Sequence, residues 1–193
     1  MSVSKQFFKK KFYGDTMKEN RRVRMTKNCL KQAMLELLSV HGKDKISITD
    51  VCNAADINRS TFYAYYNGLD NLMSEIEDDF LEQIPLPFDQ IDSDGQCLSE
   101  LTKIFEYIKS NVNIVRVFMF RTNDDGFILK LTKYIYEHYK NKLQKPDSVE
   151  ERYSIIYRIS GAIGLIKNWI TDGFPISTAE FARFTLMIAV PTA

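Results

Sequence analysis

The sequence lacks the features that would place it among membrane, secreted or metal-binding proteins. No run of apolar residues approaches the ~18 that a transmembrane helix needs. The N-terminal stretch has no sustained apolar segment with a small-residue cleavage site, so we expect no secretory signal. The three cysteines are odd in number and widely spaced, which indicates reduced thiols in a cytoplasmic protein. The two histidines have no ligand partners at metal-binding spacing, and we expect neither a metal ion nor a cofactor.

Motifs for catalysis are missing as well. The sequence shows no nucleophile elbow, no phosphate-binding loop and no cluster of metal ligands. The acidic motifs at residues 92–95 and 123–126 do not continue into a calcium-binding loop, so we expect turns there. No strand pattern or repeat appears. These absences argue against an enzyme and favour an all-α protein.

The net charge is near zero overall but unevenly distributed. Residues 1–66 hold 13 Lys and Arg against 6 Asp and Glu, a net charge of +7, whereas residues 67–193 hold 13 against 19, a net charge of −6. The two parts add to the +1 of the whole chain. A basic N-terminal part on an acidic remainder is typical of a phosphate-binding surface joined to a body that DNA repels.

Residues 46–72 carry the most informative pattern, in which two short predicted helices are separated by a tight turn and followed by a bracing helix. Ser47 with Asp50 three residues later predicts a capping box at the start of the first helix. The apolar residues of that helix recur on one narrow face: Ile48, Val51, Cys52 and Ala55. Asp56 and Ile57 break the helix, and Asn58 can cap the next one.

The second short helix, expected from Arg59 to Tyr66, has a polar and aromatic surface. Phe62 and Tyr66 are its anchors toward a core, and the side chains left for other contacts are Arg59, Ser60, Thr61, Tyr63 and Tyr65. Such a helix, resting on an apolar one, suits reading of the DNA major groove. The alternative is an ordinary pair of helices in a helical protein. The basic charge of this part favours a DNA-binding helix-turn-helix.

Amphipathic stripes predict further helices on both sides of this motif. They cover residues 26–40 and 69–80, and then 98–112, 114–120, 127–139, 148–172 and 177–190. Proline-containing residues 84–87 and the polar stretch 89–95 mark a domain boundary. The predicted domains are a basic extension over 1–22, a helix-turn-helix domain over 23–83 and a helical domain over 84–193. The extension either contacts the minor groove or packs loosely.

The stretch 148–172 is apolar nearly all round, which predicts burial on more than one side. A second subunit would supply that burial, so we expect a homodimer that pairs this helix and the last helix with their mates. The predicted interface residues are Gly161, Gly164, Phe181 and Phe184. Two recognition helices in such a dimer would lie about one DNA turn apart, which predicts an inverted-repeat operator in double-stranded DNA.

With these elements placed, the chain resembles the tetracycline-repressor (TetR) family of one-component transcriptional regulators. The resemblance is closest over residues 26–80, at Val51, Ala54-Ala55, Ile57-Asn58, Thr61-Phe62-Tyr63, Tyr65-Tyr66 and Leu72. It continues more weakly in GAIGLIKNWITDGFP at residues 161–175. It implies a homodimer with an N-terminal DNA head and a C-terminal domain for effector binding and dimerisation. We expect a ligand-responsive repressor; the alternatives are an activator and a helical adaptor that binds protein.

The resemblance also implies roles for single residues of the DNA head. Thr49 and Tyr65 would contact phosphates, and base-edge or backbone contacts would come from Arg59, Ser60, Thr61 and Tyr63, with Asn58 at the start of their helix. Leu69 stands where many members place a phosphate-binding lysine, and Lys43, Lys45 or the basic N-terminal extension can compensate. Asp56 replaces the usual turn glycine, which is tolerable because Asp visits left-handed conformations more readily than most residues.

In the second domain the resemblance implies a pocket for a small-molecule effector of unknown identity. The candidate pocket residues are Phe105, Tyr107, Phe118, Met119, Tyr134, Tyr153, Tyr157 and Trp169. The alternative for each is an ordinary place in the core.

Overall fold

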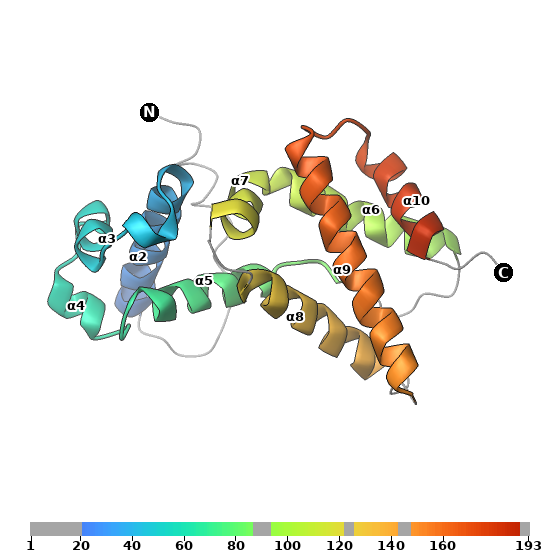
Figure 1. The fold of residues 1–193 in the computed structure, drawn as a ribbon. Helices are drawn as coiled ribbons and strands as arrows, with labels where there is room; N and C mark the ends of the chain where they lie inside the picture. The colour runs from blue at the N-terminus through green and yellow to red at the C-terminus, as the bar shows by residue number, and fades with distance from the viewer. Residues whose placement is uncertain (1–20, 87–93, 122–125, 143–147, 190–193) are drawn as a thin grey trace. The chain divides into compact units, whose positions relative to one another are not determined.

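The computed structural model describes residues 21–86, 94–121, 126–142 and 148–189. Every regular element in these ranges is a helix (Figure 1), so the predicted all-α class is confirmed. The chain forms two compact units, Met1–Asp78 and Asp79–Ala193. The predicted basic extension lies outside the described residues, except for Arg21 and Arg22. No helix in these ranges combines the length and the apolar character needed to cross a membrane.

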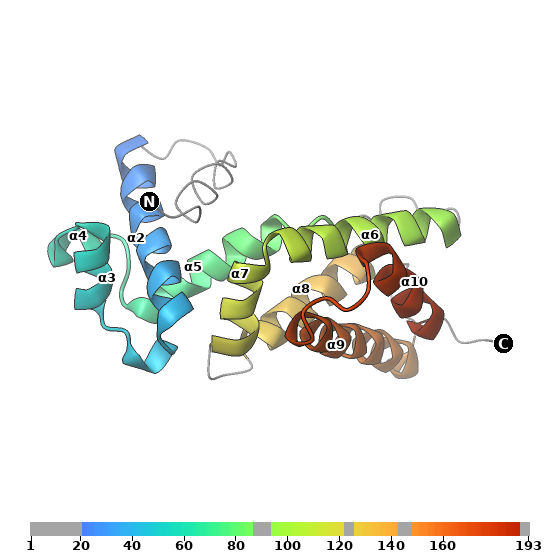
Figure 2. The same ribbon diagram turned by 90° about the horizontal axis from the view of Figure 1, so that it is seen from above.

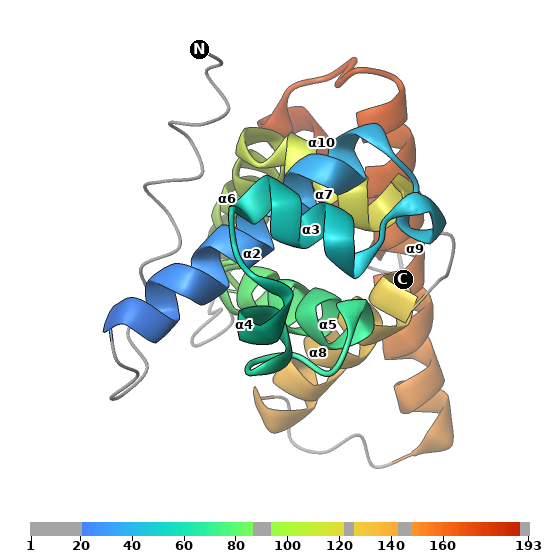
Figure 3. The same ribbon diagram turned by 90° about the vertical axis from the view of Figure 1, so that its left-hand side faces the viewer.

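The described part of the first unit starts with α2 (Arg21–Val40), followed by the short 3-10 helix η1 (Lys43–Lys45), α3 (Ile48–Ala55), α4 (Arg59–Tyr63) and the first part of α5 (Leu69–Glu82). Helix α2 packs against α3, and a short turn joins α3 to α4 (Figure 3). The apolar stripes of these helices meet in one core, whose fully buried members include Leu30, Met34, Leu38, Val51, Phe62, Leu72 and Ile76. Helix α2 starts earlier than the predicted residue 26 because its first turn is rich in arginine, where apolar periodicity gives no signal.

The second unit contains α6 (Asp94–Ser110), α7 (Val112–Arg116), the π-helical turn η2 (Val117–Arg121), α8 (Gly126–Lys142), α9 (Val149–Thr171) and α10 (Thr178–Ala189). Helix α10 packs along α6, and α8 packs along α9 (Figure 2). Two predictions need correction. The helix predicted over 114–120 is divided between α7 and η2, and Asp94 and Gly95 open α6 instead of ending a loop.

Helix α10 begins with the capping box that its sequence predicts. The backbone N–H of Glu180 donates to the Ser177 hydroxyl oxygen (3.2 Å), and the N–H of Ser177 donates to the Glu180 carboxylate (2.9 Å). The hydrogen bonds from the Ser177 side chain and backbone hold the pKa of Glu180 below its usual range. The first turn of α10 is therefore specified locally.

Aromatic rings form two clusters in the core of the second unit. In the first, which we call the Phe118 cluster, Phe118 stacks on Phe127 (4.5 Å between centroids) and both contact Phe80, which also contacts Tyr107. These contacts join α5, α6, η2 and α8.

In the second, the Trp169 cluster, Trp169 of α9 lies parallel to Phe181 of α10 (4.5 Å) and both contact Phe105 of α6. The Trp169 indole N–H donates to the carbonyl of Ile176 (3.0 Å), and Phe174 packs edge-on against the indole. Phe174 has a positive φ of 63°, which is costly for a bulky residue, so this packing holds the α9–α10 turn in an unusual conformation.

Candidate nucleic-acid interface

Side-chain caps position the first helix of the predicted motif. The N–H of Asp50 donates to the Ser47 hydroxyl oxygen (3.2 Å), while the Ser47 N–H and hydroxyl both donate to the Asp50 carboxylate (2.9 and 2.6 Å). These hydrogen bonds hold the pKa of Asp50 below its usual range. The predicted capping box is confirmed, and it fixes the residue at which α3 begins.

The turn between α3 and α4 depends on two residues that the sequence singled out. Asp56 is in the left-handed region (φ 55°, ψ 47°), and the N–H of Ile57 donates to the carbonyl of Cys52 (2.9 Å) to close the end of α3. The Asn58 carboxamide oxygen accepts from the backbone N–H of Ser60 (3.0 Å) and from the Ser60 hydroxyl (3.1 Å). Asn58 is therefore the N-cap of α4.

Helix α4 is shorter than predicted. It ends at Tyr63, and the chain continues as a turn in which the N–H groups of Tyr65 and Tyr66 both donate to the carbonyl of Phe62. Phe62 and Tyr66 are buried, as expected for anchors. Arg59, Ser60 and Tyr63 are exposed, with Tyr63 at 49%, whereas Thr61 and Tyr65 are half-buried. The helix thus presents an arginine, a hydroxyl and a tyrosine outward over an aromatic base.

The remaining candidates for phosphate contact differ in their surroundings. Thr49 and Lys45 are exposed. The Lys43 ammonium forms an ion pair with the Asp70 carboxylate (3.1 Å). Leu69, which replaces the family's lysine, is half-buried at the first position of α5.

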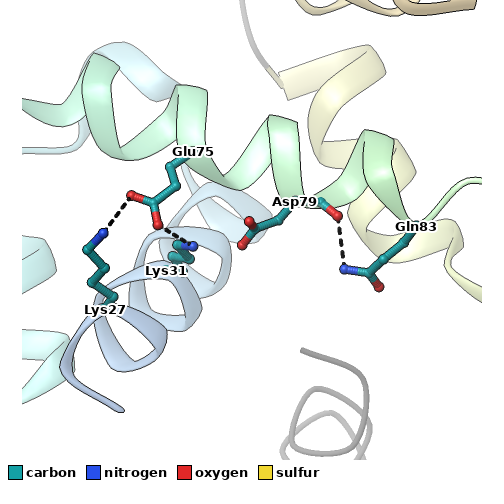
Figure 4. A network of polar contacts seen from close by, with 5 residues as sticks. All are labelled: Lys27, Lys31, Glu75, Asp79 and Gln83. Atoms are coloured by element: carbon teal, nitrogen blue, oxygen red, sulfur yellow. Dashed lines mark hydrogen bonds and ion pairs between the residues drawn. The ribbon is translucent and has the colours of Figure 1, made fainter. Parts of the chain in front are cut away.

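A polar group that was not predicted from the sequence joins α2 to α5. The Lys31 ammonium lies 2.6 Å from one oxygen of the Glu75 carboxylate, and the Lys27 ammonium lies 3.5 Å from the other (Figure 4). Both lysines are on the same face of α2 as the buried Leu30 and Met34. The position of these lysines beside the apolar stripe of α2 indicated that they lie near the core. The pattern within one helix cannot show which carboxylate of another helix pairs with them.

The effector-pocket candidates do not come together as one site. Phe105 and Trp169 belong to the Trp169 cluster, Tyr107 and Phe118 belong to the Phe118 cluster, and Met119 is buried. Burial raises the pKa of Tyr107 to about 12, and burial together with the charge of Glu82 raises the pKa of the half-buried Tyr134. Two candidates need correction. Tyr153 and Tyr157 are 60% and 80% exposed on α9, so neither lines the interior of the second unit.

The interface candidates are also divided. Gly161 is exposed, Gly164 is partly exposed, and a Cβ added at either would meet no atom within 4 Å. Phe184 is 42% exposed on α10. The prediction for Phe181 needs correction, because Phe181 is buried within its own subunit against Trp169 and is not available to a partner surface.

Within the described ranges no His, Cys, Asp and Glu side chains gather as a metal-binding group.

Comparison with known proteins identifies the class to which this geometry belongs. Residues 97–189 match the TetR-type family model described as the transcriptional regulator C-terminal region. This match decides the family of the second unit. Residues 97–189 are the C-terminal region of a TetR-family transcriptional regulator. The predicted resemblance is confirmed, and it extends through the second unit.

Several relatives of this TetR-family chain are similar over most of their length. It is 26% identical over 172 residues to the HTH-type dhaKLM operon transcriptional activator DhaS of Lactococcus lactis subsp. lactis (strain IL1403), covering 86% of this chain and 90% of the relative. The crystal structure of a TetR transcriptional regulator from Streptococcus agalactiae 2603V has the same fold, with a TM-score of 0.70 at 20% identity over 89% of this chain and 97% of the other. A solved structure of a dihydroxyacetone kinase operon activator DhaS gives a TM-score of 0.55 at 19% identity, covering 85% and 93%.

These relatives are regulators of transcription and not enzymes. This TetR-family chain is accordingly a DNA-binding transcriptional regulator, which agrees with the lack of catalytic motifs in its sequence.

Proposed function

We propose that this regulator binds an inverted-repeat operator in double-stranded DNA as a homodimer and that a small-molecule effector controls binding. The observation that carries the proposal is the outer face of α4, where Arg59, Ser60 and Tyr63 are exposed above the buried Phe62. An arginine can donate two hydrogen bonds to a guanine edge, and hydroxyls can contact bases or phosphates. Thr49, Tyr65, Lys43 and Lys45 would add phosphate contacts, and the protein would act in the cytoplasm.

Exposed apolar side chains of the second unit support the homodimer. Tyr153, Tyr157 and Gly161 follow one another at intervals of four residues on α9, and Phe184, Met187 and Ile188 form an exposed apolar patch on α10. A second copy of these two helices would remove both surfaces from water and build a four-helix interface. Closed two-fold assembly also matches the symmetry of an inverted-repeat operator.

The direction of regulation has two candidates. The sequence led us to expect a repressor. A relative that covers most of this chain is named an operon activator, which favours activation as the second candidate. Transcription from a promoter that carries the selected operator, measured with and without the protein, separates the two.

Selection of an operator from random duplex DNA tests the proposal, followed by binding assays with Arg59→Ala and Tyr63→Ala. Each substitution removes an exposed side chain without opening the core, so each should weaken operator binding by roughly 1–3 kcal/mol and leave the thermal midpoint nearly unchanged. Glu36→Gln, an exposed change on α2, is the control. If both variants bind the selected operator like wild type, α4 is not the reading helix.

Light scattering tests the assembly. Gly161→Leu has room within one subunit, where a Cβ meets nothing within 4 Å, so any loss of the dimer reports on the partner surface. Lys133→Leu, an exposed change on α8 away from the proposed surface, should leave the dimer intact. A wild-type monomer at micromolar concentration would contradict both the homodimer and the inverted-repeat operator.

A further inference from the structure

One carboxylate in the first unit serves two helices. Glu75 of α5 receives the ammonium groups of Lys31 and Lys27, which lie four residues apart on α2 (Figure 4). The two lysines contact different oxygens of this carboxylate, at 2.6 and 3.5 Å. A single side chain therefore fixes α5 along one turn of α2.

Burial makes this contact difficult to replace. Lys31 is 7% exposed and is the only buried charged residue in the described part of the chain. A buried ammonium group is strongly unfavourable unless a charge and hydrogen bonds compensate it. Burial alone would raise the pKa of Glu75, but the hydrogen bond from Lys31 and the charges of both lysines outweigh burial and hold that pKa below its usual value. Glu75 is thus ionised at neutral pH, as its partners require.

The same group of residues also contacts Tyr66, in the turn that follows α4. The Lys27 ammonium lies over the ring of Tyr66, 5.8 Å from its centroid. The Tyr66 hydroxyl adds a small contribution that lowers the pKa of Glu75. Tyr66 packs on Phe62 (5.6 Å), and Phe62 meets Tyr63 edge to face (5.6 Å). Contacts therefore run without a break from Glu75 to a side chain on the exposed face of α4.

Helix α4 needs such support because it is short. It has five residues, and a helix of that length is not stable without tertiary packing. The Asn58 cap orders its first turn, while its last turn depends on Phe62, Tyr66 and the residues that surround them. The orientation of Tyr63 is then set partly by what holds Tyr66 in place.

We propose that Glu75 is a positioning residue for operator recognition, which acts through Lys27, Lys31 and Tyr66 to hold α4 at the angle that base contacts require. The inference rests on the proposed role of α4 in reading DNA. In this proposal Glu75 does not contact DNA and acts only through the orientation of α4. Its loss should therefore change the preference for the operator over random sequence, and should leave the number of phosphates that the protein contacts unchanged.

A set of variants separates positioning from simple stabilisation. Glu75→Gln leaves the Lys31 charge buried without its counter-charge, and should lower both the thermal midpoint and the operator preference. In the double variant Lys31→Met, Glu75→Leu an apolar pair replaces the ion pair, which often restores stability. Lys27→Met is a milder change, since Lys27 is more exposed. Glu36→Gln makes the same charge change at an exposed site on α2 and is the matched control.

Two affinities are measured, one for the selected operator and one for a scrambled duplex, at a temperature well below the thermal midpoint of each variant. The hydrogen exchange of the Tyr66 amide is measured as well. Glu75→Gln should reduce the ratio of the two affinities about tenfold, and Lys27→Met should reduce it less. The double variant should regain the midpoint but not the ratio. The Tyr66 amide should exchange faster in these variants while the Val51 amide of α3 does not, and the salt dependence of binding to the scrambled duplex should stay as in wild type.

Two results would overturn the positioning role. In one, Lys27→Met and the double variant keep the wild-type ratio of operator affinity to scrambled-duplex affinity. In the other, the ratio of the double variant recovers together with its thermal midpoint. A steeper salt dependence on loss of Glu75 would mean that the lysines contact phosphates and that the carboxylate masks them, which also overturns it. A wild-type protein with no preference for any duplex would remove the proposed function itself. A selective wild type with equally selective variants would remove only this inference.

Discussion

The two units of this regulator differ in the length of their helices and in what holds the shortest ones. Side-chain caps begin helices in both units, at Ser47 and Asn58 in the first and at Ser177 in the second, but α4 of the first unit has only five residues. The second unit has helices of up to 23 residues and a core dominated by the Phe118 and Trp169 clusters. Short helices are marginal by themselves, so their ends must be specified locally, whereas long helices can be fixed by a few large contacts.

The exposed surfaces of the two units differ in the same way. The outer face of α4 offers mostly hydrogen-bonding groups, as a DNA-reading surface should. The second unit leaves large apolar side chains in water, with Tyr157 at 80% and Met187 at 61% exposure. The polar face of α4 and the apolar surface of the second unit agree with the two partners proposed above, DNA and a second copy of this chain.

The largest expected effect is on the aromatic core of the second unit. Trp169→Ala removes the stacking on Phe181 and the hydrogen bond to Ile176, and leaves a cavity. It should cost about 3–5 kcal/mol of unfolding free energy, measured by denaturant titration. Leu129→Ala, at a 71% exposed position on α8, should change the stability by less than about 0.5 kcal/mol. A small effect of Trp169→Ala would mean that this cluster does not dominate its unit.

At the turn between α3 and α4, stability should depend on the backbone conformation that residue 56 can adopt, and not on the volume of its side chain. Asp56 is left-handed, and a β-branched residue is strained there, so Asp56→Val should destabilise the protein by roughly 1–2 kcal/mol. Asp56→Gly should be neutral or slightly stabilising, because glycine adopts this conformation without strain. Thermal unfolding measures both. Equal stability of the two variants would show that the turn can rearrange.

A smaller effect is expected from the cap of α4. Asn58→Ala removes the acceptor for the Ser60 N–H and should cost about 1 kcal/mol in denaturant unfolding. Asn53→Ala changes an exposed asparagine within α3 that caps nothing, and should be neutral or better. If both variants lose a similar amount of unfolding free energy, the Asn58 cap does not contribute specifically to stability.

The smallest expected effect concerns electrostatics at the start of α5. Leu69→Lys supplies the ammonium that many family members have there, so it should tighten binding to operator and random DNA alike. The salt dependence should steepen by about one unit of slope, from one more released counterion. Leu69 is half-buried, so a thermal midpoint is measured alongside. An unchanged slope would mean that this helix end does not approach the phosphate backbone.

Local signals predicted the parts of the structure that local interactions build. The capping boxes at Ser47 and Ser177 and the Asn58 cap involve residues two or three positions apart, so sequence spacing reveals them. Predictions failed where a distant contact decides. Tyr153 and Phe181 were both aromatic positions on apolar helices. Phe181 is buried where α10 packs along α6, whereas Tyr153 of α9 is 60% exposed.

Neighbouring residues along the chain were enough to predict an all-helical protein, a helix-turn-helix after Ile46 and the anchors Phe62 and Tyr66, because helical periodicity and capping depend on neighbours along the chain. Packing between helices sets the end of α4 at Tyr63, the division of the aromatic residues of the second unit into two clusters, and the pairing of Glu75 with both Lys27 and Lys31. Charge pairing and ring stacking between helices depend on how the helices are packed, and the spacing of residues along one helix carries no information about that packing.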